Sequence, residues 1–222
     1  AKAKRLAGNK IDFDVSSVGA TGNILMAAVL ARGTTVITNA AREPEIVALE
    51  KFLVRMGANI EGIGTDRLEV EGVDALHPAD EAMIPDRIEA GTLLAAAAIT
   101  GGDVRLERCR PSQLRSLLRH LKQAGCTVSS GEDWVSLKAP RHLKAVNVTT
   151  AVYPGFPTDM QAQWLALMTV AKGTSRVTDT IYFDRFKHVP ELIRLGADIG
   201  IAKNEAAVHG VKRLVGAMVM ST

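Results

Sequence analysis

The sequence predicts an α/β protein built from three copies of one repeat with a period of about 70 residues. Two observations support this. An Ala/Leu-rich segment opens each copy, as in ATGNILMAAVLARG, RIEAGTLLAAAAITGG and TDMQAQWLALMTVAKG. Glycines then recur at nearly equal spacing, at Gly33 and Gly57, Gly101 and Gly125, and Gly173 and Gly196. We therefore expect each copy to be one βαβαββ unit.

The elements follow in the same order in each copy. The Ala/Leu-rich helix ends at a glycine, which enters the left-handed region without a Cβ penalty, and a β-rich run such as 34–38 or 104–106 follows. An amphipathic helix comes next, and a two-stranded hairpin closes the unit. Apolar residues recur at helical spacing at Ile46, Leu49, Leu53 and Met56, and at Leu114, Leu117, Leu118 and Leu121; the hairpin turns are expected at 64–66, 131–133 and 203–205.

The first helix of a copy is apolar nearly all round, as residues 24–30 and 93–99 show. Such a helix is expected to be fully buried. A single unit cannot close its own core, so several copies must pack with helices inside and sheets outside.

Composition excludes several classes of protein. The longest apolar runs, 24–31 and 92–99, are shorter than the about 20 residues that a membrane-spanning helix needs. The net charge of +3 and the 4% aromatic content give no sign of nucleic-acid binding. The two cysteines, Cys109 and Cys126, have no partner at metal-binding spacing, so no metal or cofactor is predicted and a reducing cytoplasm is expected. The basic residues Arg115, Arg119 and Lys122 fall on one helix face, which is interpreted as solvated.

Four segments carry a resemblance to a known family. They are SVGAT at 17–21, NAAREPEI at 39–46, PDRIE at 85–89 and YPGFPTDMQAQ at 153–163. Together they resemble the UDP-N-acetylglucosamine enolpyruvyl transferases (1-carboxyvinyltransferases). The resemblance runs through the whole chain and implies a fold of six repeats in two inside-out α/β barrel domains, with the active site between them.

The resemblance also implies how the chain is divided. Residues 1–84 correspond to the last repeat of the first, catalytic domain, and residues 85–222 to two repeats of the second. The chain is thus expected to be a central fragment, because the family's mobile loop with its cysteine acid and several arginines have no counterpart here.

The implied activity is transfer of enolpyruvyl from phosphoenolpyruvate to the 3-hydroxyl of UDP-N-acetylglucosamine by addition and elimination, the first committed step of peptidoglycan synthesis. The implied partners are these two substrates and the remainder of the enzyme, and the chain alone is expected to be inactive. A non-catalytic sugar-nucleotide-binding or complementing module is one alternative. A relative of RNA 3′-end-processing enzymes is another, which the scarce aromatic residues disfavour.

Asp159 is the predicted catalytic residue. It lies directly before an apolar helix, so from the sequence alone the simplest interpretation is that Thr158 or Asp159 caps that helix. The resemblance implies that the Asp159 carboxylate is the general base that takes the proton from the sugar hydroxyl.

The segment Ser16, Ser17, Val18 and Gly19 is the predicted diphosphate site. It precedes a helix expected to begin near Thr21, and small residues there can leave backbone N–H groups free to face an anion. The alternative is a capped loop of small residues without a ligand.

The remaining candidates follow from the resemblance. Ile181 is expected to contact the sugar nucleotide through its backbone, and Arg185 to lie near the reacting groups, unless it is an ordinary salt-bridged surface residue. Phe183 stands where the family often has an acid, so no acidic role is expected there. Asp86 and Arg87 could face the cleft, or could simply form a charged helix start.

Overall fold

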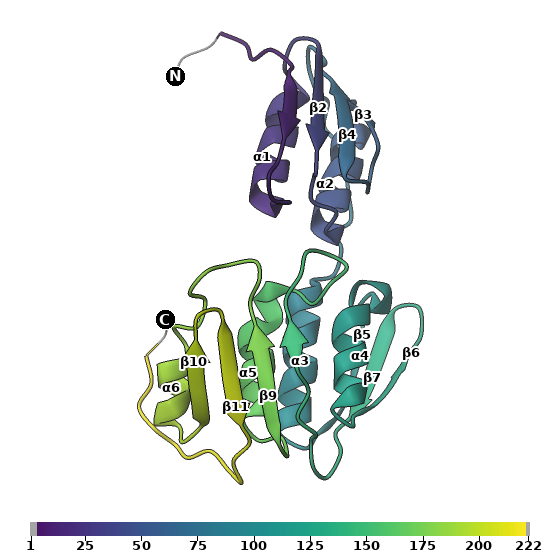
Figure 1. The fold of residues 1–222 in the computed structure, drawn as a ribbon. Coiled ribbons are helices and arrows are strands. Elements are labelled where there is room, and N and C mark those ends of the chain that lie inside the picture. Colours follow the sequence, from purple (N-terminus) through teal and green to yellow (C-terminus); the bar gives the residue numbers. More distant parts are fainter. Residues whose placement is uncertain (1–3, 221–222) are drawn as a thin grey trace. The chain divides into compact units, whose positions relative to one another are not determined.

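The computed structural model describes residues 4–220, and the chain divides into two compact units, Ala1–Ile84 and Pro85–Thr222 (Figure 1). The division falls at the residue where the resemblance places the crossover between domains. That residues 1–84 belong to one domain of the whole protein and residues 85–222 to the other remains a prediction. The two units are described one at a time below.

Unit 1, Ala1–Ile84, holds one complete βαβαββ repeat (Figure 1). Its elements are β1 (Lys10–Asp12), α1 (Val18–Ala28), β2 (Thr34–Thr38), α2 (Pro44–Arg55), β3 (Asn59–Glu61) and β4 (Arg67–Glu71). The sheet order is β1-β2-β4-β3, with β1 parallel to β2 and the other pairs antiparallel. Leu25, Ile37, Leu68 and Val70 form the centre of its core and are fully buried.

Unit 2, Pro85–Thr222, holds two further repeats around one continuous core. The first consists of α3 (Arg87–Ile99), β5 (Asp103–Glu107), the 3-10 turn η1 (Pro111–Gln113), α4 (Arg115–Gln123), β6 (Thr127–Ser130) and β7 (Trp134–Lys138). The second consists of β8 (Val148–Thr149), the 3-10 turn η2 (Thr158–Met160), α5 (Gln161–Met168), β9 (Thr174–Thr178), α6 (Val189–Arg194), β10 (Asp198–Ala202) and β11 (Glu205–His209). In Figure 1 the helices α3 and α5 run side by side behind the strands of this unit, and the two helices are in contact.

Local sequence explains where the helices start and stop. Pro44 occupies the first turn of α2, where its missing N–H costs nothing. Gly57, Gly101, Gly125 and Gly196 each follow a helix C-cap residue directly and have positive φ angles of 98°, 73°, 99° and 91°. The predicted helix stop at a glycine is confirmed at Gly101. It is wrong at Gly33 and Gly173, because α1 already ends at Ala28 and α5 at Met168.

The predicted order of elements is confirmed in the first and third copies and is wrong in one respect in the second. No strand precedes α3 within the described residues, so the second sheet has the order β5-β7-β6 with β5 at an edge. In the other two sheets a short parallel strand, β1 or β8, covers the corresponding edge. As a result Leu106 of β5 is only partly buried, whereas its counterparts Ile37 and Val177 are fully buried.

The expectation that the first helices are fully buried is also wrong. Met26 of α1, Leu30 just after that helix, and Leu93 of α3 are 49%, 43% and 50% exposed. Among the described residues α1 contacts mainly α2, β2 and β4 of its own repeat, which bury one side of it, whereas α3 packs against α5 and η2 as well as β5 and β7 and still leaves Leu93 exposed. Among residues 4–220, none of the helices combines the length and the apolar character that a membrane span requires.

Candidate functional site

Asp159 lies in the 3-10 turn η2, and its side chain is half exposed. Its Oδ1 accepts a hydrogen bond from Nη2 of Arg185 at 2.8 Å. Neither Thr158 nor Asp159 accepts a capping hydrogen bond from the backbone of η2 or α5, as far as the described residues go. The capping interpretation of Asp159 is therefore wrong, and the carboxylate is directed toward Arg185 instead.

Arg185 belongs to the loop that follows β9. Its Nη1 donates to Oγ1 of Thr158 at 2.8 Å while its Nη2 donates to Asp159, so the planar guanidinium bridges two adjacent residues of η2. Its guanidinium carbon lies 5.0 Å from the centre of the Tyr182 ring. Asp184, directly before it, has a φ of 58°, a left-handed conformation that aspartate tolerates better than most residues. Arg185 does form a salt bridge, but with the predicted base itself.

The sequence analysis missed Asp179, which lies under this pair. The residue is 1% exposed and comes directly after β9. Its carboxylate accepts hydrogen bonds from the hydroxyls of Thr150 (2.9 Å) and Thr158 (2.6 Å) and from the N–H groups of Ile181 (2.9 Å) and Tyr182 (3.0 Å). An acid at the end of a buried strand was the only signal in the sequence.

These hydrogen bonds set the charge state of Asp179. Burial favours the neutral acid and would by itself raise the pKa of Asp179. The hydrogen bonds from Thr158, Tyr182, Ile181 and Thr150 outweigh burial, and the pKa lies below its ordinary value. The site therefore contains a buried, ionised carboxylate beneath the exposed carboxylate of Asp159.

The neighbouring predicted residues are placed as follows. Ile181 is partly buried, and because its N–H is bonded to Asp179, its carbonyl is the backbone group left to meet a ligand. Phe183 is 84% exposed and offers no acid or base. His188 lies three residues after Arg185 in the chain. Burial lowers the pKa of His188, and the charge of Arg185 lowers it further by a smaller amount.

The predicted diphosphate segment lies in unit 1. The helix α1 begins at Val18, three residues earlier than the predicted Thr21. Ser17 is its N-cap, and its Oγ accepts from the N–H of Ala20 at 3.3 Å. Among the described residues nothing accepts from the N–H groups of Val18 and Gly19. A Cβ built on Gly19 meets no atom within 4 Å, so the approach to these groups is open, and Ser16 lies partly buried beside them.

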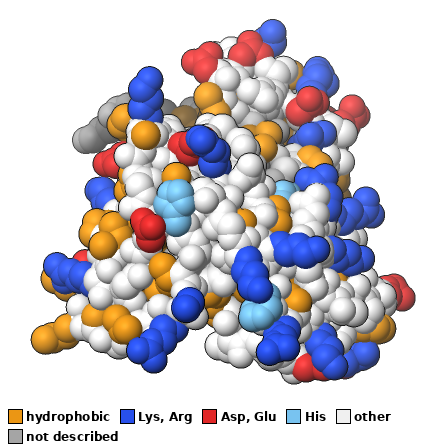
Figure 2. All heavy atoms as spheres, turned by 60° about the horizontal axis from the view of Figure 1, so that its bottom comes forward, with side chains coloured by type: hydrophobic (Ala, Val, Ile, Leu, Met, Phe, Trp, Pro, Cys, Tyr) orange, Lys and Arg blue, Asp and Glu red, His pale blue; other side chains and the backbone are white. Residues whose placement is uncertain are grey.

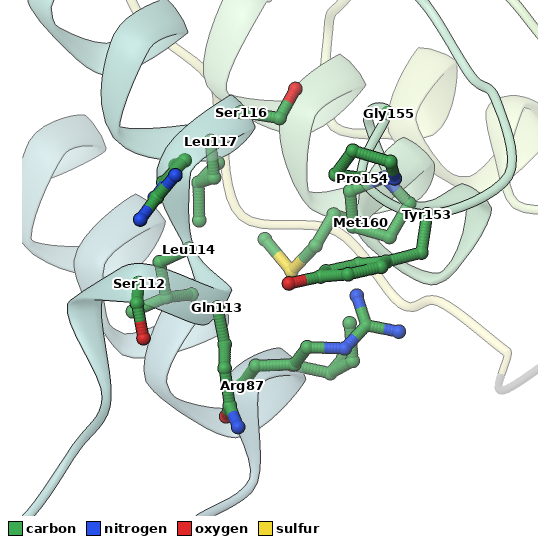
Figure 3. Close-up of a pocket in the computed structure, with 13 residues that line it drawn as sticks. Arg87, Ser112, Gln113, Leu114, Ser116, Leu117, Tyr153, Pro154, Gly155 and Met160 are labelled. Carbon is green, nitrogen blue, oxygen red and sulfur yellow. The ribbon is translucent and has the colours of Figure 1, made fainter. Parts of the chain in front are cut away.

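Asp86 and Arg87 begin α3 in unit 2. Asp86 is the N-cap, and its Oδ1 accepts from the N–H groups of Ile88 (2.7 Å) and Glu89 (3.2 Å), which confirms the charged helix start. The Arg87 guanidinium lies 5.7 Å from the centre of the Tyr153 ring. Figure 3 shows the side chains of Arg87 and Tyr153 at a cavity of about 230 Å³. Ser112, Gln113, Leu117 and Met160 also line this cavity. Neither Asp159 nor Arg185 lines this cavity.

The basic face of α4 is solvated as predicted. Arg115, Arg119 and Lys122 are exposed and form no ion pair with any residue between 4 and 220. They line an open groove of about 730 Å³ beside Ser130. Lys and Arg side chains are also frequent on the face of the protein drawn in Figure 2. No cluster of metal-ligating side chains occurs in the described part of the chain.

The fold and the site together define a class: an α/β protein of βαβαββ repeats carrying an exposed carboxylate held by an arginine. The family model for EPSP synthase (3-phosphoshikimate 1-carboxyvinyltransferase) matches residues 1–222. The chain therefore belongs to the EPSP synthase family, and the predicted fold class is confirmed.

Individual relatives narrow the comparison further than the family model does. The chain is 58% identical to UDP-N-acetylglucosamine 1-carboxyvinyltransferase of Chlorobium chlorochromatii, covering 100% of the chain and 52% of the relative. It is 54% identical to the protein of the same name from Myxococcus xanthus, covering 100% and 53%. The crystal structure of the enolpyruvyl transferase NikO from Streptomyces tendae matches with a TM-score of 0.84 at 26% identity, covering 94% of the chain and 52% of that protein. The chain thus spans about half the length of these relatives.

Proposed function

We propose that the protein containing this chain transfers the enolpyruvyl group of phosphoenolpyruvate to the 3-hydroxyl of UDP-N-acetylglucosamine, at the start of peptidoglycan synthesis. Support comes from the relatives of that name, which match the whole chain at more than 50% identity. Support within the chain comes from the single pair of Asp159 and Arg185. A cytoplasmic location accompanies this proposal and agrees with the two free, buried thiols of Cys109 and Cys126.

The chemistry assigns a role to each member of the pair. A hydroxyl that attacks a carbon must lose its proton, and a carboxylate within hydrogen-bond reach can accept it. Asp159 is exposed enough to meet a substrate, and the single hydrogen bond to Oδ1 leaves Oδ2 available. Arg185 fixes the direction of the carboxylate and places positive charge where phosphate or carboxylate groups of the substrates would gather.

The segment Ser16–Gly19 is proposed to receive the diphosphate of the sugar nucleotide. The N–H groups of Val18 and Gly19 stand at the positive end of α1 and are open to solvent. Ser17 caps the helix and holds the backbone in place. Gly19→Ala keeps the N–H but adds a methyl group, so it should weaken nucleotide binding without loss of fold.

The test is phosphate release by the complete protein with both substrates present. We expect Asp159→Asn to lower kcat by about 10²–10⁴-fold, the usual contribution of a general base. Asp198→Asn is the matched control, because Asp198 is an exposed aspartate at the start of β10. Equal rates for Asp159→Asn and Asp198→Asn would contradict the assignment of the base.

The same two proteins, the 222-residue chain and the complete protein, distinguish the proposed transferase from the two alternative functions. The 222-residue chain alone should release no phosphate, whereas the complete protein should. Calorimetry that detects UDP-N-acetylglucosamine binding to the complete protein without phosphate release would favour a non-catalytic binding module. RNA binding that weakens with salt would favour the end-processing alternative.

A further inference from the structure

Asp179 joins three segments that are far apart in the sequence. Thr150 follows β8, Thr158 begins η2, and Ile181 lies in the loop after β9. Each donates a hydrogen bond to the one buried carboxylate, at 2.9, 2.6 and 2.9 Å. Thr150 is itself fully buried, and its hydroxyl also accepts from the N–H of Thr180 at 2.9 Å. The carboxylate of Asp179 is therefore held among fixed neighbours.

The hydrogen bond from Thr158 has a fixed direction. A threonine hydroxyl has one proton to donate and two lone pairs with which to accept. Because an ionised carboxylate can only accept, the hydroxyl proton of Thr158 must go to Oδ2 of Asp179. The lone pairs of the same oxygen then face Nη1 of Arg185, which can only donate, at 2.8 Å.

The orientation continues through Arg185 to Asp159. With Nη1 held by Thr158, the planar guanidinium has little freedom to rotate, and its Nη2 is directed at Oδ1 of Asp159 at 2.8 Å. Thr158 donates to Asp179, and Arg185 donates to both Thr158 and Asp159. Every donor in this chain of hydrogen bonds therefore meets an acceptor. Turning the Thr158 hydroxyl proton toward Arg185 instead would bring two donors together.

We propose that Asp179 is a positioning residue for the candidate base: it orients the Thr158 hydroxyl, which orients Arg185, which holds the Asp159 carboxylate in its reactive direction. The catalytic consequence rests on the proposed function, whereas the positioning itself does not. Asp179 does not reach the solvent and would touch neither substrate.

Asp179 also holds the loop after β9 through the N–H groups of Ile181 and Tyr182. Its substitution could therefore unfold this loop whatever its effect on Asp159. Variants of Thr158 avoid this difficulty, because they leave the contacts of Asp179 with Thr150 and the loop unchanged. Thr158→Ser keeps the hydroxyl, and Thr158→Val replaces it by a methyl group of nearly the same size.

The first experiment uses the 222-residue chain and needs no activity. Nitrogen-15 NMR of the arginine side chains reports whether the two Nη groups of Arg185 rotate freely. We expect slow rotation in the wild type and in Thr158→Ser, and fast rotation in Thr158→Val and in Asp179→Asn. Thr174→Val is the matched control, because it removes an exposed hydroxyl that bonds His209 on the neighbouring strand β11, at the opposite end of β9 from Asp179. Slow rotation in Thr158→Val would overturn the proposal.

The second experiment measures phosphate release by the complete protein. A misplacement of the reacting groups by about 1 Å can cost about 10²-fold in rate. We expect kcat of Thr158→Val to fall by about that factor with little change in KM for the nucleotide sugar, and Thr158→Ser to recover most of the loss. Equal kcat values for the two variants, in an active wild type, would overturn the positioning role. An inactive wild type with the expected NMR result would instead overturn the proposed function and leave the positioning intact.

Discussion

At the residue scale, Glu50 of α2 is a second buried carboxyl, but it has far fewer partners than Asp179. It is fully buried, its Oε2 accepts from the N–H of Gly64 at 2.8 Å, and its Oε1 has no partner among the described residues. Burial raises the pKa of Glu50 from its ordinary 4.5 to about 7, although the Gly64 hydrogen bond opposes the shift. These two buried acids thus have opposite charge preferences because of the number of donors each meets.

The Glu50 shift predicts a pH-dependent stability. The folded state binds this proton more tightly than the unfolded state, so the free energy of unfolding falls as the pH rises from about 4.5 to about 7. Glu50→Gln removes the titration and should raise the free energy of unfolding at pH 8 by on the order of 2 kcal/mol, with little effect at pH 4. Urea unfolding at both pH values measures this, with the exposed Glu61→Gln as control. An equal effect of Glu50→Gln at pH 4 and pH 8 would contradict it.

The same contrast shows what the sequence can reveal about a site. Asp159 and Arg185 could be named from a local motif, because their residue types and neighbours in the chain are distinctive. Asp179 could not, since its importance comes from contacts with Thr150 and Thr158, which only the folded chain brings together. Ser17 lies between these cases: its type predicts a cap, but the sequence placed the start of α1 at Thr21 rather than at Val18.

At the element scale, two helical glycines with different surroundings give a paired prediction. A Cβ on Gly22 of α1 would lie 3.6 Å from Ile46 and 3.7 Å from Leu49, which is ordinary contact. A Cβ on Gly91 of α3 would lie 2.7 Å from Leu117 and 2.9 Å from the sulfur of Met160, both fully buried. Gly22→Ala should therefore raise the free energy of unfolding by about 0.5–1 kcal/mol, whereas Gly91→Ala should lower it by about 1–3 kcal/mol.

Thermal and urea unfolding of the two variants provide the measurement. Because both substitutions change helix propensity by the same amount, their difference isolates packing. A gain in stability for Gly91→Ala would mean that α3 and η2 can separate more easily than the contacts of Met160 indicate.

The order of helices and strands was predictable where residues close in the sequence decide it. It was not predictable where pairing or packing with a distant part of the chain decides it. The glycine stop after α3, Pro44 and the hairpin turns are local, and the structure confirms them. The missing strand before α3 is not local, because a strand forms only by pairing with another strand, and none of the described residues before α3 pairs with the open edge of β5. The incomplete burial of α1 has the same origin, since an apolar helix surface is covered only where a second layer is present.

At the scale of the whole molecule, the sheets of the three repeats can be compared position by position. Val36, Arg105 and Arg176 are the central residues of β2, β5 and β9, which pair with β4, β7 and β11 in the same antiparallel register. The N–H of Val36 donates to the carbonyl of Asn9 at 3.0 Å, and that of Arg176 to the side chain of Asn147 at 2.8 Å. By this correspondence the N–H of Arg105 faces away from β7, toward the open edge of its sheet.

Hydrogen exchange should reveal this difference directly. We expect the amide of Arg105 to exchange at least tenfold faster than those of Val36 and Arg176, because an N–H at an open edge is not held by a neighbouring strand. Leu106 is the control within the same strand: successive N–H groups point to opposite sides of a strand, so its amide faces β7 and should be protected. If Arg105 and Leu106 exchange equally slowly at all protein concentrations, another part of the chain covers this edge. If the protection of Arg105 grows with concentration, a second copy covers it instead, and either result would contradict an open edge on β5.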